Sequence, residues 1–183
     1  MKELVFLLEE ESAKALIESL LAKLQCQIHH RLIVFQGKQD LEKQIERKLR
    51  GYLNSDAHFI ILRDQDRGDC RVIKKSLKAK CKRAGRTDAI IRIACRELEA
   101  FYLGDLAAVE AGLGIKGLSA KQAVAKFRNP DSLQSPSAEL IKLTNRRYQK
   151  IAGSRAIAPY MNIDSTRSKS FHHLVQAIRK ASL

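Results

Sequence analysis

The stretch that decides the fold reads Ala57-His58-Phe59-Ile60-Ile61-Leu62-Arg63-Asp64-Gln65-Asp66-Arg67-Gly68. Its first half is a short apolar run with the length and composition of a buried β-strand. Its second half is an acidic turn, in which Asp64 and Asp66 follow the strand directly. In parallel α/β sheets, functional side chains lie at the carboxyl ends of the strands. The stretch therefore predicts a strand that delivers two carboxylates to such an edge.

Three further apolar runs predict strands, and each is separated from the next by a segment with helical periodicity. The strands are expected at residues 3–8, 31–35 and 89–94, and the helices at residues 13–24, 41–53, 73–84 and 96–111. Ser12 is expected to cap the first helix and Gly85 to end the third. This alternation predicts an α/β fold with a mainly parallel four-stranded sheet, Rossmann-like and flanked by helices.

The pattern changes beyond residue 112, where glycine and proline separate short helical segments. Helices are expected near residues 120–127 and 138–151, with a last one at 171–181. We therefore predict a core at residues 1–112 and a helical cap at residues 113–183, packed together as one unit. A chain of 183 residues has the length of one such domain.

The amino terminus and the cysteines indicate a cytoplasmic protein. The first apolar run stops at Glu9-Glu10-Glu11, too early for a secretory signal, and no segment has the roughly 20 apolar residues of a membrane span. The four cysteines lack Cys-x-x-Cys spacing, which favours free thiols over a zinc site or a disulfide.

The charge predicts a polyanionic partner. Lys and Arg total 34 against 20 Asp and Glu, a formal net charge of +14. Nucleic acid is the leading candidate, because each phosphate that a protein neutralises releases condensed counterions. A basic surface that serves solubility, or that binds an acidic protein, is the alternative.

Three acids are candidate metal ligands. Asp64 and Asp66 follow one strand, and Glu9 follows the strand at residues 3–8. Mg²⁺ and Mn²⁺ prefer oxygen ligands, with water and substrate phosphate completing the shell. The alternative for Glu9 and its neighbours is stabilisation of a helix amino terminus, and Asp69 is expected to be a helix cap.

These segments resemble the Toprim family, the metal-dependent catalytic module of topoisomerases, bacterial primases and nucleases of the overcoming-lysogenization-defect type. The family pairs a Glu after its first strand with an Asp-x-Asp after a later one. Leu8-Glu9-Glu10-Glu11-Ser12 and Leu62-Arg63-Asp64-Gln65-Asp66-Arg67-Gly68 match these elements. Glu10 stands where the family usually has Gly, so either Glu9 or Glu10 can be the acid that matters. The resemblance implies that Glu9, Asp64 and Asp66 are catalytic.

The chain also resembles, over nearly its whole length, the domain-of-unknown-function family numbered 4276, a stand-alone Toprim-like group. The resemblance runs through Arg96-Glu97-Leu98-Glu99 and the segment at 167–171. Related nucleases carry a similar Arg-Glu-x-Glu stretch, which makes Glu97 and Glu99 candidate second-metal or support residues beside Glu10.

Other uses of the acidic turn fit poorly. An EF-hand would need glycine at Asp69 and a bidentate Glu at Lys75. Haloacid-dehalogenase-like phosphatases usually carry Asp-x-Asp on their first strand. No Gly-x-Gly-x-x-Gly follows a strand, which argues against dinucleotide binding.

Basic residues flank the acids and are candidates for nucleic-acid binding. One stripe follows the acidic turn along a single helix face. The candidates are Arg67, Arg71, Lys74, Lys75, Lys78, Lys82, Arg96, Arg167 and Lys169, with a second basic region at Arg146, Arg147, Lys150 and Arg155. A solvated amphipathic face is the alternative for the stripe. Aromatic residues are only 5%, so no stacking platform for bases is visible.

We therefore expect Mg²⁺-dependent (or Mn²⁺-dependent) phosphodiester cleavage of DNA or RNA. The resemblance further implies a phage-defence effector that works beside an ATPase partner protein. The rival hypothesis is a non-catalytic nucleic-acid-binding or regulatory subunit of an ATPase complex.

Overall fold

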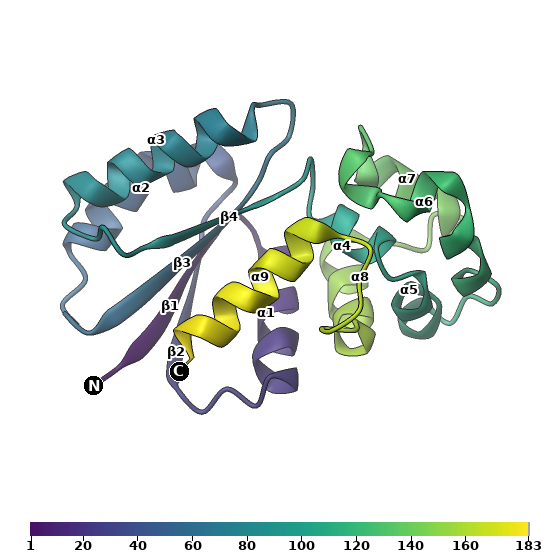
Figure 1. Ribbon diagram of the computed structural model, residues 1–183, viewed down its shortest axis with the longest axis horizontal. Helices are drawn as coiled ribbons and strands as arrows, with labels where there is room; N and C mark the ends of the chain where they lie inside the picture. The colour runs from purple at the N-terminus through teal and green to yellow at the C-terminus, as the bar shows by residue number, and fades with distance from the viewer. Residues whose placement is uncertain (183) are drawn as a thin grey trace.

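The structure is a computed structural model that describes residues 1–182, and it is built around one parallel sheet (Figure 1). The strands are β1 (Glu3–Leu8), β2 (His29–Val34), β3 (Ala57–Asp64) and β4 (Ile90–Ala94). Their order is β2-β1-β3-β4, and every neighbouring pair is parallel. The predicted α/β class, with four parallel strands flanked by helices, is confirmed.

Two layers of helices cover the sheet (Figure 1). One face packs against α2 (Lys38–Arg50) and α3 (Cys70–Arg83), and the other against α1 (Glu11–Lys23) and α9 (Lys169–Ala181). All six residues of β1 are buried, as expected for a central strand covered on both faces. The sheet thus separates two apolar cores, one on each side.

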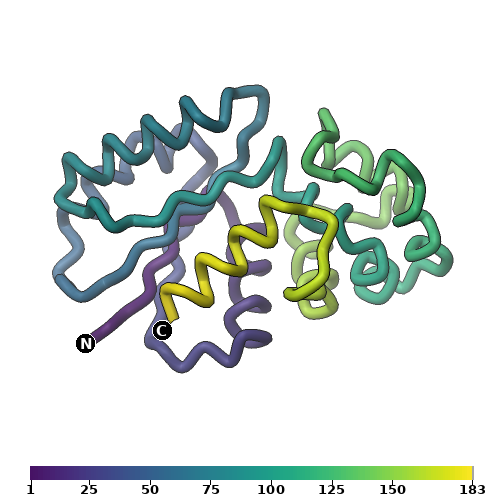
Figure 2. Tube along the Cα trace, viewed as in Figure 1, coloured from purple at the N-terminus to yellow at the C-terminus, as the bar shows by residue number. Residues whose placement is uncertain are grey.

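The short helices between β4 and α9 gather at the carboxyl ends of the strands (Figure 1). They are α4 (Glu99–Leu103), α5 (Leu106–Leu113), α6 (Ala125–Arg128), α7 (Pro136–Leu143) and α8 (Lys150–Ile157), with 3-10 turns at Ser119–Ala123, Pro130–Ser132 and Ala158–Tyr160. From here on, the name helical cap means this group, residues 99–160, and no longer the predicted segment at 113–183. The last helix, α9, leaves the cap and runs back along the sheet, so its carboxyl end lies near the amino ends of the strands (Figure 2).

Three local predictions are wrong, each for a physical reason. The helix expected at 96–111 is broken at Gly104, whose carbonyl accepts a hydrogen bond from the Arg167 N–H, and Asp105 then caps α5. The helix expected at 138–151 is interrupted where Asn145 and Arg146 take positive φ. Ser12 lies inside α1 and donates to Glu10 Oε1 instead of capping the helix.

Two turn predictions are confirmed. The Asp69 side chain accepts hydrogen bonds from the N–H groups of Arg71 and Val72 and so caps α3. Gly85 follows that helix with a φ of 77°, which glycine adopts without steric strain. Within residues 1–182, no helix is both long and apolar enough to cross a membrane.

Candidate active site at the carboxyl edge of the sheet

The strand order places a topological switch point between the carboxyl ends of β1 and β3. The chain passes from β1 to β2 on one side and from β3 to β4 on the other, so the connections diverge where Leu8 lies beside Leu62. Open α/β sheets bind ligands at this kind of switch point. Glu9 and Asp64 are the acidic residues at these two strand ends.

Glu9 and Asp64 are in direct contact, since Glu9 Oε2 accepts a hydrogen bond from the Asp64 N–H at 3.0 Å. Asp64 is only 8% exposed. Burial, reinforced by the charges of Glu9, Glu99 and Glu10, raises the pKa of Asp64 well above its usual range. Burial also raises the pKa of Glu9, and the charges of Asp66 and Glu10 add to the effect. Crowded, desolvated acids of this kind favour protonation or a bound cation.

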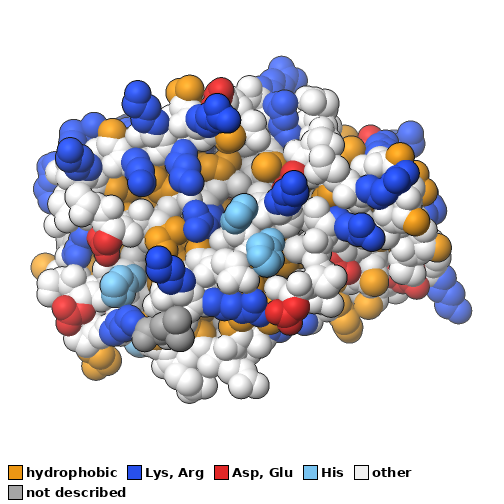
Figure 3. Space-filling model, in the orientation of Figure 1, with side chains coloured by type: hydrophobic (Ala, Val, Ile, Leu, Met, Phe, Trp, Pro, Cys, Tyr) orange, Lys and Arg blue, Asp and Glu red, His pale blue; other side chains and the backbone are white. Residues whose placement is uncertain are grey.

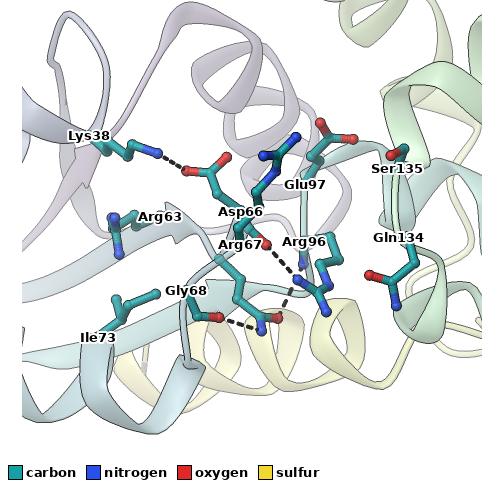
Figure 4. A pocket seen from close by; sticks show the side chains of 11 residues that line it. Lys38, Arg63, Asp66, Arg67, Gly68, Ile73, Arg96, Glu97, Gln134 and Ser135 are labelled. Atoms are coloured by element: carbon teal, nitrogen blue, oxygen red, sulfur yellow. Dashed lines mark hydrogen bonds and ion pairs between the residues drawn. The ribbon is translucent and has the colours of Figure 1, made fainter.

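Asp66 is fixed by a turn that is tied to the end of β4. Its N–H donates to the Arg96 carbonyl at 2.7 Å, and Arg96 Nη1 donates back to the Asp66 carbonyl at 3.1 Å. Both residues have positive φ, 53° and 61°, which is unusual for side chains other than glycine and is found preferentially at functional sites. The Asp66 carboxylate accepts from Lys38 Nζ at 2.7 Å (Figure 4).

Glu10 is turned toward the helical cap. Lys150 of α8 contacts its Oε1 at 2.7 Å. Burial by itself would lower the pKa of Lys150, but the carboxylates of Glu10, Glu99 and Asp64 outweigh it and the pKa is raised. Lys150 therefore acts as the counter-ion of this group of acids.

The two candidate glutamates after β4 have different surroundings. Glu97 Oε2 accepts from the Ser137 N–H at 2.7 Å, at the start of α7. Glu99 is fully buried and accepts a hydrogen bond from the Tyr148 hydroxyl at 2.9 Å, while its Oε2 has no partner among the described residues. Burial raises the pKa of Glu99. Glu99 belongs with Asp64, whereas Glu97 faces the hollow beside Asp66.

That hollow, of about 430 Å³, opens beside the acids and is rich in cations (Figure 4). Lys38, Arg63, Arg67 and Arg96 line it together with Asp66. Arg63 is 7% exposed and pairs with Glu42 at 3.1 Å, but its Nε and Nη1 atoms have no partner among the described residues. A buried guanidinium with free donors is suited to an anion.

The predicted basic residues divide among several surfaces. Arg67 and Arg96 line the hollow beside Asp66, while Arg71, Lys74 and Lys169 line a second one farther along β4. The others are exposed away from both: Lys75, Lys78 and Lys82 on α3, with Arg146, Arg147, Arg155 and Arg167 in and next to the helical cap. Of these residues, Arg67 and Arg96 share a hollow with the candidate acids Asp66 and Glu97.

The chain matches the family described as a domain of unknown function (DUF4276) over residues 8–179. It belongs to this family. The DUF4276 match takes in Glu9, the turn at Asp64 and Asp66, and Lys150 of the cap. Comparisons with curated proteins and with solved structures gave no match.

The acids of this DUF4276 domain are of the kind that binds a divalent cation, but within the described part of the chain their side chains do not converge on a single cation position. Carboxylates that raise one another's pKa are the donors that Mg²⁺ selects. Among residues 1–182, however, no three acidic, histidine or cysteine side chains converge on a common point. Asp66 and Glu10 are instead turned to Lys38 and Lys150. Binding a cation requires these two ion pairs to open.

Sequence reasoning missed several residues of the DUF4276 site. Arg63 was expected in the acidic turn and without a role of its own, whereas it lies buried inside β3, where a charged side chain is a signal of a paired or functional group. Lys150 was predicted only as part of a basic surface, and the sequence predicted no role for Lys38 or Tyr148. The last three come from segments whose position depends on tertiary packing, so no local pattern identifies them.

Proposed function

We propose that this domain cleaves phosphodiester bonds in nucleic acid with the help of Mg²⁺ or Mn²⁺. The observation that carries the proposal is the meeting of Glu9 and Asp64 at the switch point, with Asp66 close enough to raise the pKa of Glu9. These are the three acids that the Toprim resemblance names as catalytic. A cationic hollow beside them offers a place for the phosphate.

The acids form two groups that share Glu9. Asp64, Glu10 and Glu99 lie toward α8, whereas Asp66 and Glu97 face the hollow. A bound divalent cation would lower the pKa of a water molecule and stabilise charge on the phosphate. Burial and the neighbouring carboxylates raise the pKa of Glu9, which makes it a better proton acceptor than an exposed glutamate.

Cations of the chain itself complete the site. Arg63, Arg67 and Arg96 line the same hollow and bring positive charge to it. The Nε and Nη1 atoms of Arg63 are buried without a partner among the described residues, so this side chain must turn toward the hollow before they can donate to a phosphate oxygen. Lys38 and Lys150 neutralise Asp66 and Glu10. Each lysine must release its carboxylate before that oxygen binds a metal, which leaves an ammonium group free to approach the substrate.

One observation favours a second candidate function, a non-catalytic nucleic-acid-binding or regulatory subunit. Two of the acids are satisfied by lysines, and no three converge within residues 1–182. In that case the acids stabilise the turns and the basic surfaces bind nucleic acid. An ATPase partner and a place in phage defence belong to both candidates, and they rest on the family resemblance alone.

The test is cleavage of plasmid DNA and of tRNA by the purified protein with Mg²⁺, Mn²⁺ or EDTA. Glu9→Gln keeps the shape of the side chain but removes its charge, and Glu11→Gln, at an exposed neighbour in α1, is the matched control. We expect the unaltered protein to cleave when metal is present. The cleavage rate should fall at least 100-fold in Glu9→Gln and should be unchanged in Glu11→Gln. Salt-sensitive binding without cleavage under every condition would establish the second candidate instead.

A further inference from the structure

A second hollow, of about 530 Å³, lies over the edge strand β4 between α3 and α9. Arg71 and Lys74 line it from α3, Ile91 and Ile93 from β4, and Lys169 from α9. On this face, Lys and Arg side chains border an apolar strip that is exposed between the two helices (Figure 3). The hollow is therefore apolar at its base and cationic at its rim.

A third hollow joins the second one to the candidate active site. It shares Arg67, Gly68 and Arg96 with the hollow beside Asp66, and it shares Cys70 and Arg71 with the hollow over β4. The three hollows thus adjoin one another, and we call the surface that they make together the β4 groove. It leads from the acids, past the start of α3, to the first turn of α9.

The β4 groove carries a large uncompensated positive charge. Among the described residues, eight Lys and Arg side chains line it, of which Lys38 and Arg63 are paired with acids. The other six have no acidic partner among residues 1–182; they are Arg67, Arg71, Lys74, Arg92, Arg96 and Lys169. Beyond the active site its carboxylates are engaged elsewhere: Asp69 caps α3, and Asp131 accepts hydrogen bonds from Ser168 and Ser170. The groove is complementary to a polyanion.

The shape of the groove favours nucleic acid over an added peptide strand. Arg92 donates to the carbonyl groups of Ile91 and His173 and so covers part of the free edge of β4, which blunts strand addition. Each hollow has a volume in the ~300–1,000 Å³ range of small-molecule sites, which suits one nucleotide at a time. Among residues 1–182, no Phe, Tyr or Trp lines the groove, so phosphate contacts must supply most of the affinity.

We propose that the β4 groove binds one single strand of nucleic acid and leads it to or from the acidic site. Phosphates lie against the cations of the rim, and sugars or bases cover Ile91 and Ile93. The statement that the strand runs to or from the acidic site rests on the proposed function, because the groove begins at Asp66. Its binding step requires no metal and no cleavage.

The first test measures binding in EDTA, by fluorescence anisotropy of labelled oligonucleotides across a salt series. Arg71→Ala/Lys74→Ala removes two exposed groove cations, and Lys116→Ala/Lys121→Ala removes two exposed cations from the helical cap as the control. We expect the groove variant to bind a single strand about tenfold more weakly, with a salt slope smaller by ~1.4, because each phosphate contact contributes ~0.7. The control should behave as the unaltered protein.

The native cysteines give a second, independent readout. Cys70 is exposed and lines the groove, whereas Cys26, partly exposed, lies beside Ser182 at the other end of α9. A bound single strand should slow alkylation of Cys70 severalfold and leave Cys26 unchanged, as followed residue by residue by mass spectrometry. Equal rates at Cys70 with and without oligonucleotide would contradict the proposal.

Other outcomes separate the groove from the nuclease. Equal affinity in the groove variant and the control overturns the groove, whether or not the protein cleaves. A duplex bound more tightly than the single strand, or displacement by polyglutamate at equal charge, also overturns it. Binding through the groove without cleavage under any metal condition rejects the proposed function and leaves the groove standing.

Discussion

The sheet side and the cap side of the candidate active site are built differently. On the sheet side, Glu9, Asp64 and Asp66 are held by strand ends and by backbone hydrogen bonds to the residues after β4. On the cap side, Glu99 and Lys150 are the first residues of the short helices α4 and α8, and Tyr148 lies in the loop before α8. The sheet side provides the acids and the cap side buries and neutralises them. The two sides should therefore respond differently to substitution.

The largest effect is expected from Asp64→Asn on the sheet side. It removes a buried charge at the centre of the acids, so we expect at least a 100-fold loss of cleavage rate with Mg²⁺ or Mn²⁺. Asp88→Asn, an exposed acid paired with His58, is the control and should retain full activity. Cleavage that survives Asp64→Asn would remove Asp64 from the proposed ligands.

Asp64→Asn is expected to stabilise the folded protein, although it should slow cleavage. Because the pKa of Asp64 is raised in the folded state, its contribution to stability is full below the unfolded pKa near 4 and is lost as pH rises through the folded value. Asp64→Asn should unfold at a higher temperature at neutral pH, by roughly 2–4 °C per kcal/mol gained, with the gain shrinking toward pH 4. Thermal unfolding in EDTA at several pH values measures it, and a pH-independent difference would contradict the burial argument.

On the cap side, Tyr148→Phe leaves the buried Glu99 carboxylate without its hydroxyl donor. An unsatisfied buried group costs about 1–3 kcal/mol, so the free energy of unfolding by urea should fall by that amount. Tyr160→Phe, at a 56% exposed side chain, is the control and should change little. Combining Tyr148→Phe with Glu99→Gln should recover part of the loss, because the neutral amide tolerates burial better.

Lys150→Met removes the counter-ion of Glu10 from the cap side. Its side chain is 49% exposed, so solvent screening limits the expected loss to at most about 1 kcal/mol. The raised pKa of Lys150 means that its stabilisation is present at neutral pH and is lost as pH rises above the unfolded value near 10.4. In Lys150→Met, added Mg²⁺ should raise the unfolding temperature more than it does in the unaltered protein. An equal rise in both would show that Lys150 does not compete for the acids.

The smallest effect is expected for Lys38→Met, which removes the partner of Asp66 on the sheet side. Both side chains are more than one-third exposed, and such pairs contribute a few tenths of a kcal/mol. The backbone bonds to Arg96, which hold the turn, are unaffected. A loss above 1 kcal/mol would mean that the ion pair, and not the backbone, holds the Asp66 turn.

The same contrast explains how much the sequence could predict. Strand runs and helical spacing predicted the sheet, and the strand ends then located Glu9 and Asp64, because these signals are local. The helix break at Gly104 depends on the hydrogen bond that its carbonyl accepts from the Arg167 N–H. The Tyr148 hydroxyl donates to Glu99, which is 49 residues away in the sequence. Such contacts are set by tertiary packing. The sequence also does not reveal that Lys38 and Lys150 compensate the acids.

The most direct measurement is a crystal structure of the protein with Mn²⁺, in which anomalous scattering locates the metal. We expect a peak at the switch point with carboxylate oxygens of Glu9, Asp64 or Asp66 at roughly 2.0–2.2 Å, and with Lys38 or Lys150 moved away from its acid. A fully occupied crystal without a peak there, with both lysines still paired, would contradict the account.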